Sequence, residues 1–383
     1  MAPDRYEVTV IGEEPWGNYN RIMLSPVLSG DKTIDDIMLH PHAWYSDKGI
    51  RFIAGDPAVR IDRPRKQVYT EKGEVVDYDR LILATGSKPF IPTIAGSDLK
   101  GVISFRDIYD INTMLDYCKT KKNAVVIGGG LLGLEAAYGL KQRGMNVTVL
   151  HLMDRIMERQ LDSKASQMLR HSIEQKGISI ITEANTEALV GVDGHVTQIR
   201  LKDGTVLEAD LVVFAVGIRP NMALAQSAGL RCNRGVLVND TMQTFDPSIY
   251  AVGECIEHRS QTFGLVEPLW GQAFICASHL AEHGSLTFKA PTVPTQLKVS
   301  GCDVFSAGNF EPKDDFEDII LNDEKRQIYK RIIIQKDKVV GAVLFGDTED
   351  GVWYAELISD QTPISSIRNK LLFGKDFALK KAG

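Results

Sequence analysis

The chain of 383 residues has few cysteines and no long apolar run, and each absence excludes a class of protein. Its five cysteines are scattered, so none forms the CxxC pair of a redox disulfide, a zinc site or an iron–sulfur site. The longest apolar stretches, such as residues 211–216, are far shorter than the roughly 20 residues that span a bilayer. We therefore expect no membrane association, no disulfide-reductase chemistry and no metal site.

An excess of positive charge is also missing. Lysine and arginine number 44 against 50 aspartates and glutamates, which gives a formal net charge of -6. This balance argues against a nucleic-acid partner. The first seven residues contain no apolar core of a signal peptide, so we expect a cytoplasmic protein.

The strongest motif is a Gly-rich turn that follows an apolar strand. Residues 123–127 form a β-branched run, and Gly128, Gly130 and Gly133 complete a GxGxxG pattern before a stretch rich in Leu and Ala. A second strand is predicted at 147–150. In such a βαβ unit the first glycine allows the tight turn, the second lets the backbone approach a pyrophosphate, and the third lets helix and strand pack closely. The motif predicts a dinucleotide-binding site.

The chain also contains an internal repeat. Three pairs of stretches resemble each other in the same order: 8–11 and 147–150, 48–50 and 176–178, and 72–89 and 203–220. The repeat predicts two related Rossmann-like dinucleotide-binding domains, each a parallel sheet with crossover helices.

The first copy lacks the element that opens the second. The Gly-rich turn precedes the strand 147–150, whereas only seven residues precede the matching strand 8–11. We interpret this as a truncation that removes the first strand, turn and helix. The alternative is a degenerate domain that never had them, which is disfavoured because both neighbouring strand edges would then be exposed.

The predicted fold is α/β, with two Rossmann-like domains and a small α+β C-terminal domain. A hairpin is predicted over 327–345, and helices over 268–283, 353–360 and 364–373. The predicted boundaries are 1–112 with 234–293 for the first, truncated domain, 113–233 for the second, and 294–383 for the third.

Two dinucleotide-binding domains in one chain suggest hydride transfer from a nicotinamide nucleotide to a flavin. The residues then resemble a family. Ala84-Thr85-Gly86, the Gly-rich turn, 215–220 and 249–255 are similar to the two-dinucleotide-binding flavoprotein reductases. The stretches 10–15, 19–21, 24–25 and 129–137 most resemble the N-terminal FAD/NAD(P)-binding module of the NAD(P)H-dependent nitrite reductase large subunit. Rubredoxin and ferredoxin reductases share most of the pattern but often carry Lys at the position of Pro26.

The resemblance implies a set of FAD contacts. Glu13 would accept hydrogen bonds from the adenosine ribose, Arg21 would lie close to FAD, and Glu254 would hold the ribityl chain. The helix that starts near Pro268 would direct its N-terminus at the flavin, with Trp270 and Gln272 nearest the ring. The full FAD set is Glu13, Arg21, Ala84, Thr85, Gly86, Gly253, Glu254, Trp270 and Gln272.

The NAD(P)H contacts form a second set, and one of its positions departs from the family pattern. The strand 147–150 should be followed by an acid for the ribose of NAD, but His151 stands there, with Arg155 nearby. The missing acid favours the use of NADPH, or of both NADH and NADPH. Alternatively, His151 and Arg155 are surface residues and the site binds NADH. The full set is Gly128, Gly130, Leu131, Leu132, Gly133, Glu135, His151, Arg155, Val216 and Gly217.

We therefore expect an FAD-dependent NAD(P)H oxidoreductase module that needs no catalytic side chain and passes electrons to an iron–sulfur or similar acceptor. The acceptor would be the remainder of a nitrite reductase, or a rubredoxin or ferredoxin, and a homodimer is compatible with this function. The alternatives are a free-standing rubredoxin or ferredoxin reductase, and a flavin-free nucleotide-binding or interaction protein.

Overall fold

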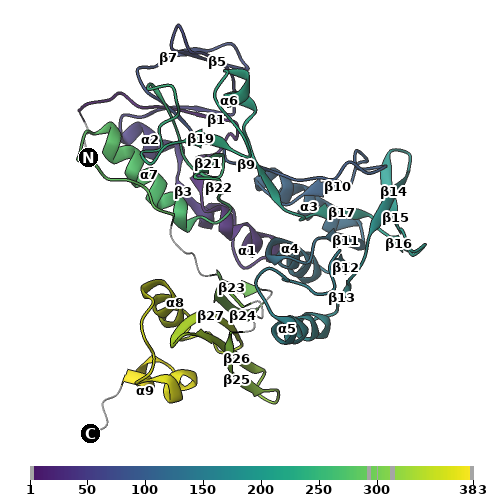
Figure 1. Ribbon diagram of the computed structural model, residues 1–383. Helices are drawn as coiled ribbons and strands as arrows, with labels where there is room; N and C mark the ends of the chain where they lie inside the picture. The colour runs from purple at the N-terminus through teal and green to yellow at the C-terminus, as the bar shows by residue number, and fades with distance from the viewer. Residues whose placement is uncertain (1–3, 291–294, 300, 311–314, 380–383) are drawn as a thin grey trace. The chain divides into compact units, whose positions relative to one another are not determined.

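The chain forms two compact units in the computed structural model, which describes residues 4–290, 295–299, 301–310 and 315–379 (Figure 1). Unit 1 comprises Met1–Leu24, Lys32–Phe90 and Gly217–Pro291, and unit 2 comprises Ser25–Asp31, Ile91–Val216 and Thr292–Gly383. The boundaries of these two units differ from those of the three predicted domains. The predicted domain boundaries therefore remain a prediction. The boundary expected between residues 293 and 294 lies outside the described residues.

The core of unit 2 is a five-stranded parallel sheet in the order β10-β17-β11-β12-β13. Its strands are β10 (Val102–Ser104), β17 (Leu211–Phe214), β11 (Asn123–Ile127), β12 (Asn146–Leu150) and β13 (Ile178–Ile181). Helix α4 (Leu131–Gln142) packs on β11 and β12, α5 (Ser163–Gln175) packs on β13, and α3 (Ile108–Thr120) precedes β11 (Figure 1). The strands predicted at 123–127 and 147–150 are thus confirmed.

A three-stranded antiparallel sheet extends unit 2. It consists of β14 (Thr186–Val192), β15 (His195–Leu201) and β16 (Val206–Glu208). Its inner residues Leu189, Val196 and Ile199 share a buried cluster with Val212 and Phe214 of the parallel sheet. The antiparallel sheet therefore covers one part of the nucleotide-domain core.

Unit 1 contains two separate parallel strand pairs where unit 2 has one sheet. β1 (Thr9–Gly12) pairs with β4 (Arg51–Ala54), and β8 (Leu81–Leu83) pairs with β20 (Ile249–Ala251). By the repeat β1 and β4 correspond to β12 and β13, and β8 corresponds to β17; β20 pairs with β8 in parallel, as β10 pairs with β17. Among the described residues no strand of unit 1 joins β1 to β8 as β11 joins β12 to β17. The counterpart of β11 is therefore the element that unit 1 lacks among the described residues, as the repeat predicts.

The remaining elements of unit 1 are short, apart from helix α7 of 14 residues. The strands are β2 (Asn18–Tyr19), β3 (Met38–His40), β5 (Ala58–Asp62), β6 (Gln67–Thr70), β7 (Val75–Asp77), β9 (Ser87–Pro89), β18 (Ile218–Pro220), β19 (Val236–Val238), β21 (Ile256–His258) and β22 (Gln261–Thr262). The helices are η1 (Arg21–Met23), η2 (Asp35–Ile37), α2 (His42–Asp47), α6 (Ala223–Ser227) and α7 (Glu267–Leu280). Helix α7 confirms the helix expected near Pro268, and α1 (Leu24–Ser29) begins in unit 1 and continues in unit 2.

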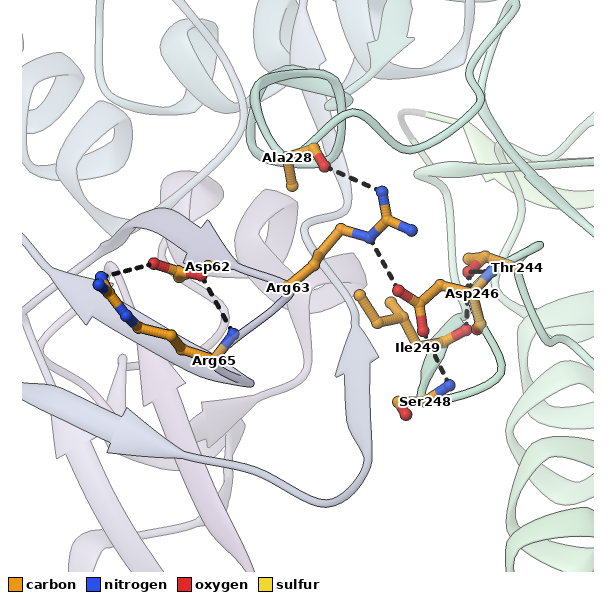
Figure 2. Close-up of polar contacts among 8 residues, drawn as sticks. All are labelled: Asp62, Arg63, Arg65, Ala228, Thr244, Asp246, Ser248 and Ile249. Atoms are coloured by element: carbon orange, nitrogen blue, oxygen red, sulfur yellow. Dashed lines mark hydrogen bonds and ion pairs between the residues drawn. The ribbon is translucent and has the colours of Figure 1, made fainter.

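A polar network holds the turn that precedes β20 (Figure 2). The Arg63 guanidinium donates to the Asp246 carboxylate at 2.8 Å and to the Ala228 carbonyl at 3.4 Å. The same carboxylate accepts a hydrogen bond from the Ser248 amide at 3.0 Å, and the Thr244 hydroxyl donates to the Ile249 carbonyl at 2.9 Å. The network fixes the start of β20, whose end leads directly to Gly253 and Glu254.

The C-terminal part of unit 2 is an antiparallel sheet in the order β23-β24-β27-β26-β25. Its strands are β23 (Thr295–Val299), β24 (Cys302–Gly308), β25 (Glu317–Asp323), β26 (Ile328–Gln335) and β27 (Lys338–Phe345), and its helices are α8 (Gly351–Asp360), η3 (Arg368–Phe373) and α9 (Lys375–Leu379). The hairpin predicted over 327–345 is confirmed. The helix predicted over 364–373 is limited to η3. The residues before η3 are held against the hairpin turn, where Pro363 bridges Lys338 and the Ile364 amide donates to the Asp337 carbonyl.

Asp162 joins this sheet to the nucleotide-binding part of unit 2. Its carboxylate caps α5 by accepting from the Ala165 amide at 2.9 Å. It also accepts from the Tyr329 hydroxyl at 2.8 Å and pairs with the Arg331 guanidinium at 3.1 Å. The side chains of Asp162 and Arg331 are 11% and 10% exposed, so this ion pair is shielded from water.

Two kinds of feature are absent from the part of the chain that the structure describes. None of its helices is both long and apolar enough to cross a membrane. Over the same residues, no group of three or more His, Cys, Asp and Glu side chains is arranged to hold a metal ion.

Helix α3 begins with two interacting acids. Asp107 is its N-cap and accepts from the Asp110 amide, while the Asp110 carboxylate accepts from the Arg106 amide at 2.7 Å. Burial and the nearby Asp107 carboxylate raise the pKa of Asp110 to about 6, against the opposing effect of its hydrogen bonds. In the unfolded chain Asp110 would titrate near its ordinary pKa of 3.8. The folded state therefore holds a proton more tightly than the unfolded state.

We predict that Asp110 by itself lowers the free energy of unfolding as pH rises from about 4 to about 6, because it must ionise in a partly buried site. Its share of the decrease should be about 1–2 kcal/mol. Asp110→Asn should remove this share, as measured by urea unfolding at a series of pH values. The control is Asp116→Asn, an exposed acid on the same helix, which should leave the pH slope unchanged. Equal slopes in wild type and Asp110→Asn would refute the prediction.

Candidate functional site

The Gly-rich turn of unit 2 brings β11, α4 and β17 closer than any side chain would permit. A Cβ on Gly133 would lie 1.9 Å from the Gly128 carbonyl oxygen. A Cβ on Gly128 would lie 2.3 Å from the Ala215 carbonyl oxygen, and its φ of +124° favours glycine. The two positions therefore require glycine, as the GxGxxG pattern predicts.

The turn leaves an open face at the N-terminus of α4. Gly130 is the N-cap, no side chain caps the helix, and no atom lies within 4 Å of the position that a Cβ would take. The amides of the first turn, which include those of Leu131 and Leu132, have no carbonyl partner within the helix. An uncapped helix N-terminus with open space beside it fits a pyrophosphate.

The next two predicted contacts lie where β17 ends. Val216 is the last residue of this segment in unit 2 and is 38% exposed, whereas Gly217 belongs to unit 1. Gly217 has a φ of +114°, and its carbonyl accepts from the Phe90 amide at 2.9 Å. Both residues thus lie at the chain crossing between the two units.

Glu135 is one helical turn into α4 and has a partner that the sequence does not reveal. The Ser25 hydroxyl of α1 donates to its carboxylate at 2.5 Å. Burial raises the pKa of Glu135, and the hydrogen bond from Ser25 offsets part of this rise. Helix α1 is held in unit 2 by Arg143, which donates to the carbonyls of Val27 and Leu28. The structure therefore places a buried carboxyl with a raised pKa near the Gly-rich turn.

His151 lies beneath the Gly-rich turn instead of facing solvent. It is 8% exposed, its Nδ1 accepts from the Gly129 amide at 3.0 Å, and its Nε2 lies 3.1 Å from Glu158. Arg155 pairs with the adjacent Asp154 at 3.2 Å, and its Nε is buried without a hydrogen-bond partner. Of these residues the sequence indicated His151 and Arg155 but not Glu158.

In unit 1, the Ala84-Thr85-Gly86 segment is fastened to the loop after β18. The Thr85 hydroxyl donates to the Asn221 carbonyl at 2.6 Å, and the Asn221 amide donates to the Gly86 carbonyl at 2.9 Å. Ala84 at the end of β8 is exposed. Asn221 could not be predicted from the sequence, because its partners Thr85 and Gly86 lie far away along the chain.

Gly253 and Glu254 are fixed by β9 and α7. The Ser87 hydroxyl donates to the Glu254 carboxylate at 2.7 Å, and the Gly253 amide donates to Gln272 Oε1 at 2.7 Å. Gln272 is fully buried, and its Nε2 has no hydrogen-bond partner. A buried donor left unpaired costs about 1–3 kcal/mol, so an acceptor atom on a bound group would stabilise it. This orphaned donor fits the predicted flavin site.

The other predicted FAD contacts of unit 1 lie on its surface. Trp270 is 70% exposed at the start of α7, and Glu13 is exposed just after β1. Arg21 pairs with Glu14, which also accepts from the Tyr19 hydroxyl at 2.6 Å. Glu14 thus positions Arg21, a role that the sequence alone did not assign. No Gly-rich strand-to-helix turn precedes β1 in the described residues of unit 1. Arg21 is therefore the residue of this unit that we predict to contact a phosphate of FAD.

The chain matches two family models. The pyridine nucleotide-disulphide oxidoreductase model matches residues 1–272, and the rubredoxin NAD+ reductase C-terminal domain matches residues 294–362. The chain belongs to the pyridine nucleotide-disulphide oxidoreductase family. FAD and NAD(P)H, the two cofactors expected from the sequence, are those of this family. The α/β fold with two dinucleotide-binding domains and a C-terminal domain is likewise that of the family.

Curated relatives include a nitrite reductase and an electron transfer subunit. A nitrite reductase [NAD(P)H] of Bacillus subtilis is 48% identical over 95% of this chain and 45% of its own length. An assimilatory nitrate reductase electron transfer subunit of the same organism is 41% identical over 96% of this chain and 48% of its own length. This chain thus spans about half the length of these relatives. The solved NADH:rubredoxin oxidoreductase of Clostridium acetobutylicum matches with a TM-score of 0.79 and 27% identity over 94% of this chain and 90% of its own.

We predict that Gly130→Ala weakens dinucleotide binding by about tenfold or more, because a methyl group would occupy the space that a pyrophosphate needs. The thermal midpoint should change little, since no protein atom lies near that methyl group. Gly133→Ala should instead lower the thermal midpoint, because its methyl group collides with Gly128. Calorimetric titration with NAD+ and thermal unfolding measure the two effects. Unchanged affinity in a folded Gly130→Ala variant would contradict the prediction.

Proposed function

We propose that this chain is the reductase module of a longer electron-transfer system, taking hydride from NAD(P)H and passing electrons through FAD to an iron–sulfur centre. The observation that carries the proposal is the uncapped, open N-terminus of α4 at Gly130, next to a turn that admits only glycine at Gly128 and Gly133. When bound, the nicotinamide and flavin supply the hydride chemistry, which depends on proximity and ring orientation more than on a catalytic side chain.

The residues of unit 2 would bind and orient the nicotinamide nucleotide. The first-turn amides of α4 would donate to the pyrophosphate, and the helix dipole would favour its negative charge. Glu135, held by Ser25, would accept or donate a hydrogen bond at the nicotinamide end according to its protonation. Its raised pKa favours the protonated carboxyl more than an exposed glutamate would.

The residues of unit 1 would hold FAD. Glu254, aligned by Ser87, would accept hydrogen bonds from ribityl hydroxyls, and the unpaired Nε2 of Gln272 would donate to an acceptor on the ring. The N-terminus of α7 would stabilise negative charge on the flavin. Arg21 would pair with a phosphate, and Glu13 would accept from the adenosine ribose.

The proposed acceptor is an iron–sulfur centre carried outside the printed sequence. The relatives named above include a nitrite reductase, an electron transfer subunit and a rubredoxin oxidoreductase, which supports an electron acceptor of this kind. The five cysteines of this chain are free thiols, and no two neighbouring positions supply the ligand spacing of a cluster. A homodimer is also compatible with this function.

A flavin-free nucleotide-binding protein is the second candidate, favoured by one observation. The strand pairs β1-β4 and β8-β20 of unit 1 are not joined by a strand within the described residues, and no Gly-rich turn accompanies them. A chain that holds NAD(P)H in unit 2 without FAD in unit 1 would have this architecture.

The first experiment is an absorption spectrum of the purified chain before and after FAD is added, followed by NADH or NADPH without oxygen. We expect a protein-bound flavin band that the nicotinamide nucleotide bleaches within the mixing time. A matched control is Val192→Ala, an exposed site in unit 2, which should behave like wild type. Bound flavin that neither nucleotide bleaches would contradict the reductase. Nucleotide binding without any flavin binding would support the second candidate.

A further inference from the structure

A loop after β12 brings an acid back to the Gly-rich turn of unit 2. The Met157 amide donates to the Gly129 carbonyl at 3.0 Å, and Ile156 lies so close that a Cβ on Gly129 would be 2.9 Å from its Cγ2. The next residue along the chain is Glu158, which is 22% exposed at its side chain. This segment therefore brings Glu158 back toward the Gly-rich turn, next to the contact between Met157 and Gly129.

His151 fixes the direction of that carboxylate. Its Nδ1 accepts the hydrogen of the Gly129 amide, so the imidazole is neutral and carries its own hydrogen on Nε2. That hydrogen is donated to Glu158 Oε2 at 3.1 Å. His151 occupies the strand-end position where dinucleotide-binding folds place the acid that binds the ribose. Here the imidazole of His151 instead hydrogen-bonds an acid, Glu158, from the following loop.

Three other charged groups belong to the same loop. Arg159 is 85% exposed and lies 3.6 Å from the second oxygen of Glu158, and Arg155 pairs with Asp154. A 2′-phosphate would need these guanidiniums, but each already has a carboxylate partner. The carboxylate of Glu158 would also repel the roughly two negative charges of a 2′-phosphate, whereas it would accept hydrogen bonds from free ribose hydroxyls.

We infer that Glu158, positioned by His151, is the acid that recognises the adenosine ribose, and that the chain selects NADH over NADPH. This inference rests on the proposed binding of a nicotinamide nucleotide to unit 2. The sequence alone favours NADPH or mixed use, because the strand end lacks an acid; the contacts of the loop supply that acid from seven residues further on.

The test compares NAD+ with NADP+, which differ only in the 2′-phosphate, by calorimetric titration of the FAD-supplemented chain. Wild type should bind NAD+ about tenfold or more tightly than NADP+. Glu158→Gln should reduce that ratio about fivefold or more, because the amide neither repels a phosphate nor accepts from both hydroxyls. Glu158→Asp, which keeps the charge, should retain weak NADP+ binding. The ratio of kcat/KM for NADH and NADPH should change in the same direction.

The matched control is Asp116→Asn, an acid-to-amide change at a 72% exposed acid of unit 2 outside this loop, which should leave the ratio unchanged. Thermal midpoints identify any variant that fails to fold, and the wild-type ratio by itself also tests the inference. Equal or tighter NADP+ binding in wild type, or the same ratio in folded Glu158→Gln, would overturn it. In either case bleaching of flavin by a nicotinamide nucleotide would leave the proposed function standing. Absence of binding by both nucleotides would overturn both proposals.

Discussion

The contact between the backbone of α4 and the end of β11 is the constraint on which unit 2 depends. At Gly133 and Gly128 the main chains of a helix and two strands meet without a side chain between them. This contact sets how closely the N-terminus of α4 approaches the parallel sheet. It therefore also determines the open space at Gly130 and the position of Glu135. A side chain at either glycine would push the helix outward and move every group that the first turn presents.

Much of this arrangement could be predicted from the sequence, because it follows local rules. The run of β-branched residues, the spacing of the glycines and the return to an apolar run specify a strand, a turn, a helix and a strand, and all four are present. The hairpin of the C-terminal sheet was predictable for the same reason. The predicted helix over 364–373 failed at its start because residues 363 and 364 pair with the hairpin turn, through the bridge between Lys338 and Pro363 and the hydrogen bond from Ile364 to Asp337.

The partners of the site residues could not be predicted, because they come from distant parts of the chain. Ser25 meets Glu135, Ser87 meets Glu254, and Thr85 meets Asn221 only after folding. The position of Glu158 depends on Met157, whose φ of 54° is unusual for a residue with a side chain. A sequence pattern does not indicate such a backbone turn, so the acid remained hidden although its residue type was visible. The roles that the family resemblance gives to the cofactor contacts remain predictions.

The three contacts of the Asp162 carboxylate restrict which amino acids position 162 can accept. Asparagine could still cap α5, but it would leave the buried guanidinium of Arg331 without this countercharge. Glutamate would keep the charge, but its longer side chain is a poor N-cap. The position is therefore restricted to one residue type by helix α5 on one side and by Tyr329 and Arg331 of β26 on the other. Loss of the C-terminal sheet would also expose the cap of α5 to water, so part of the stability of α5 depends on a sheet that lies far along the chain.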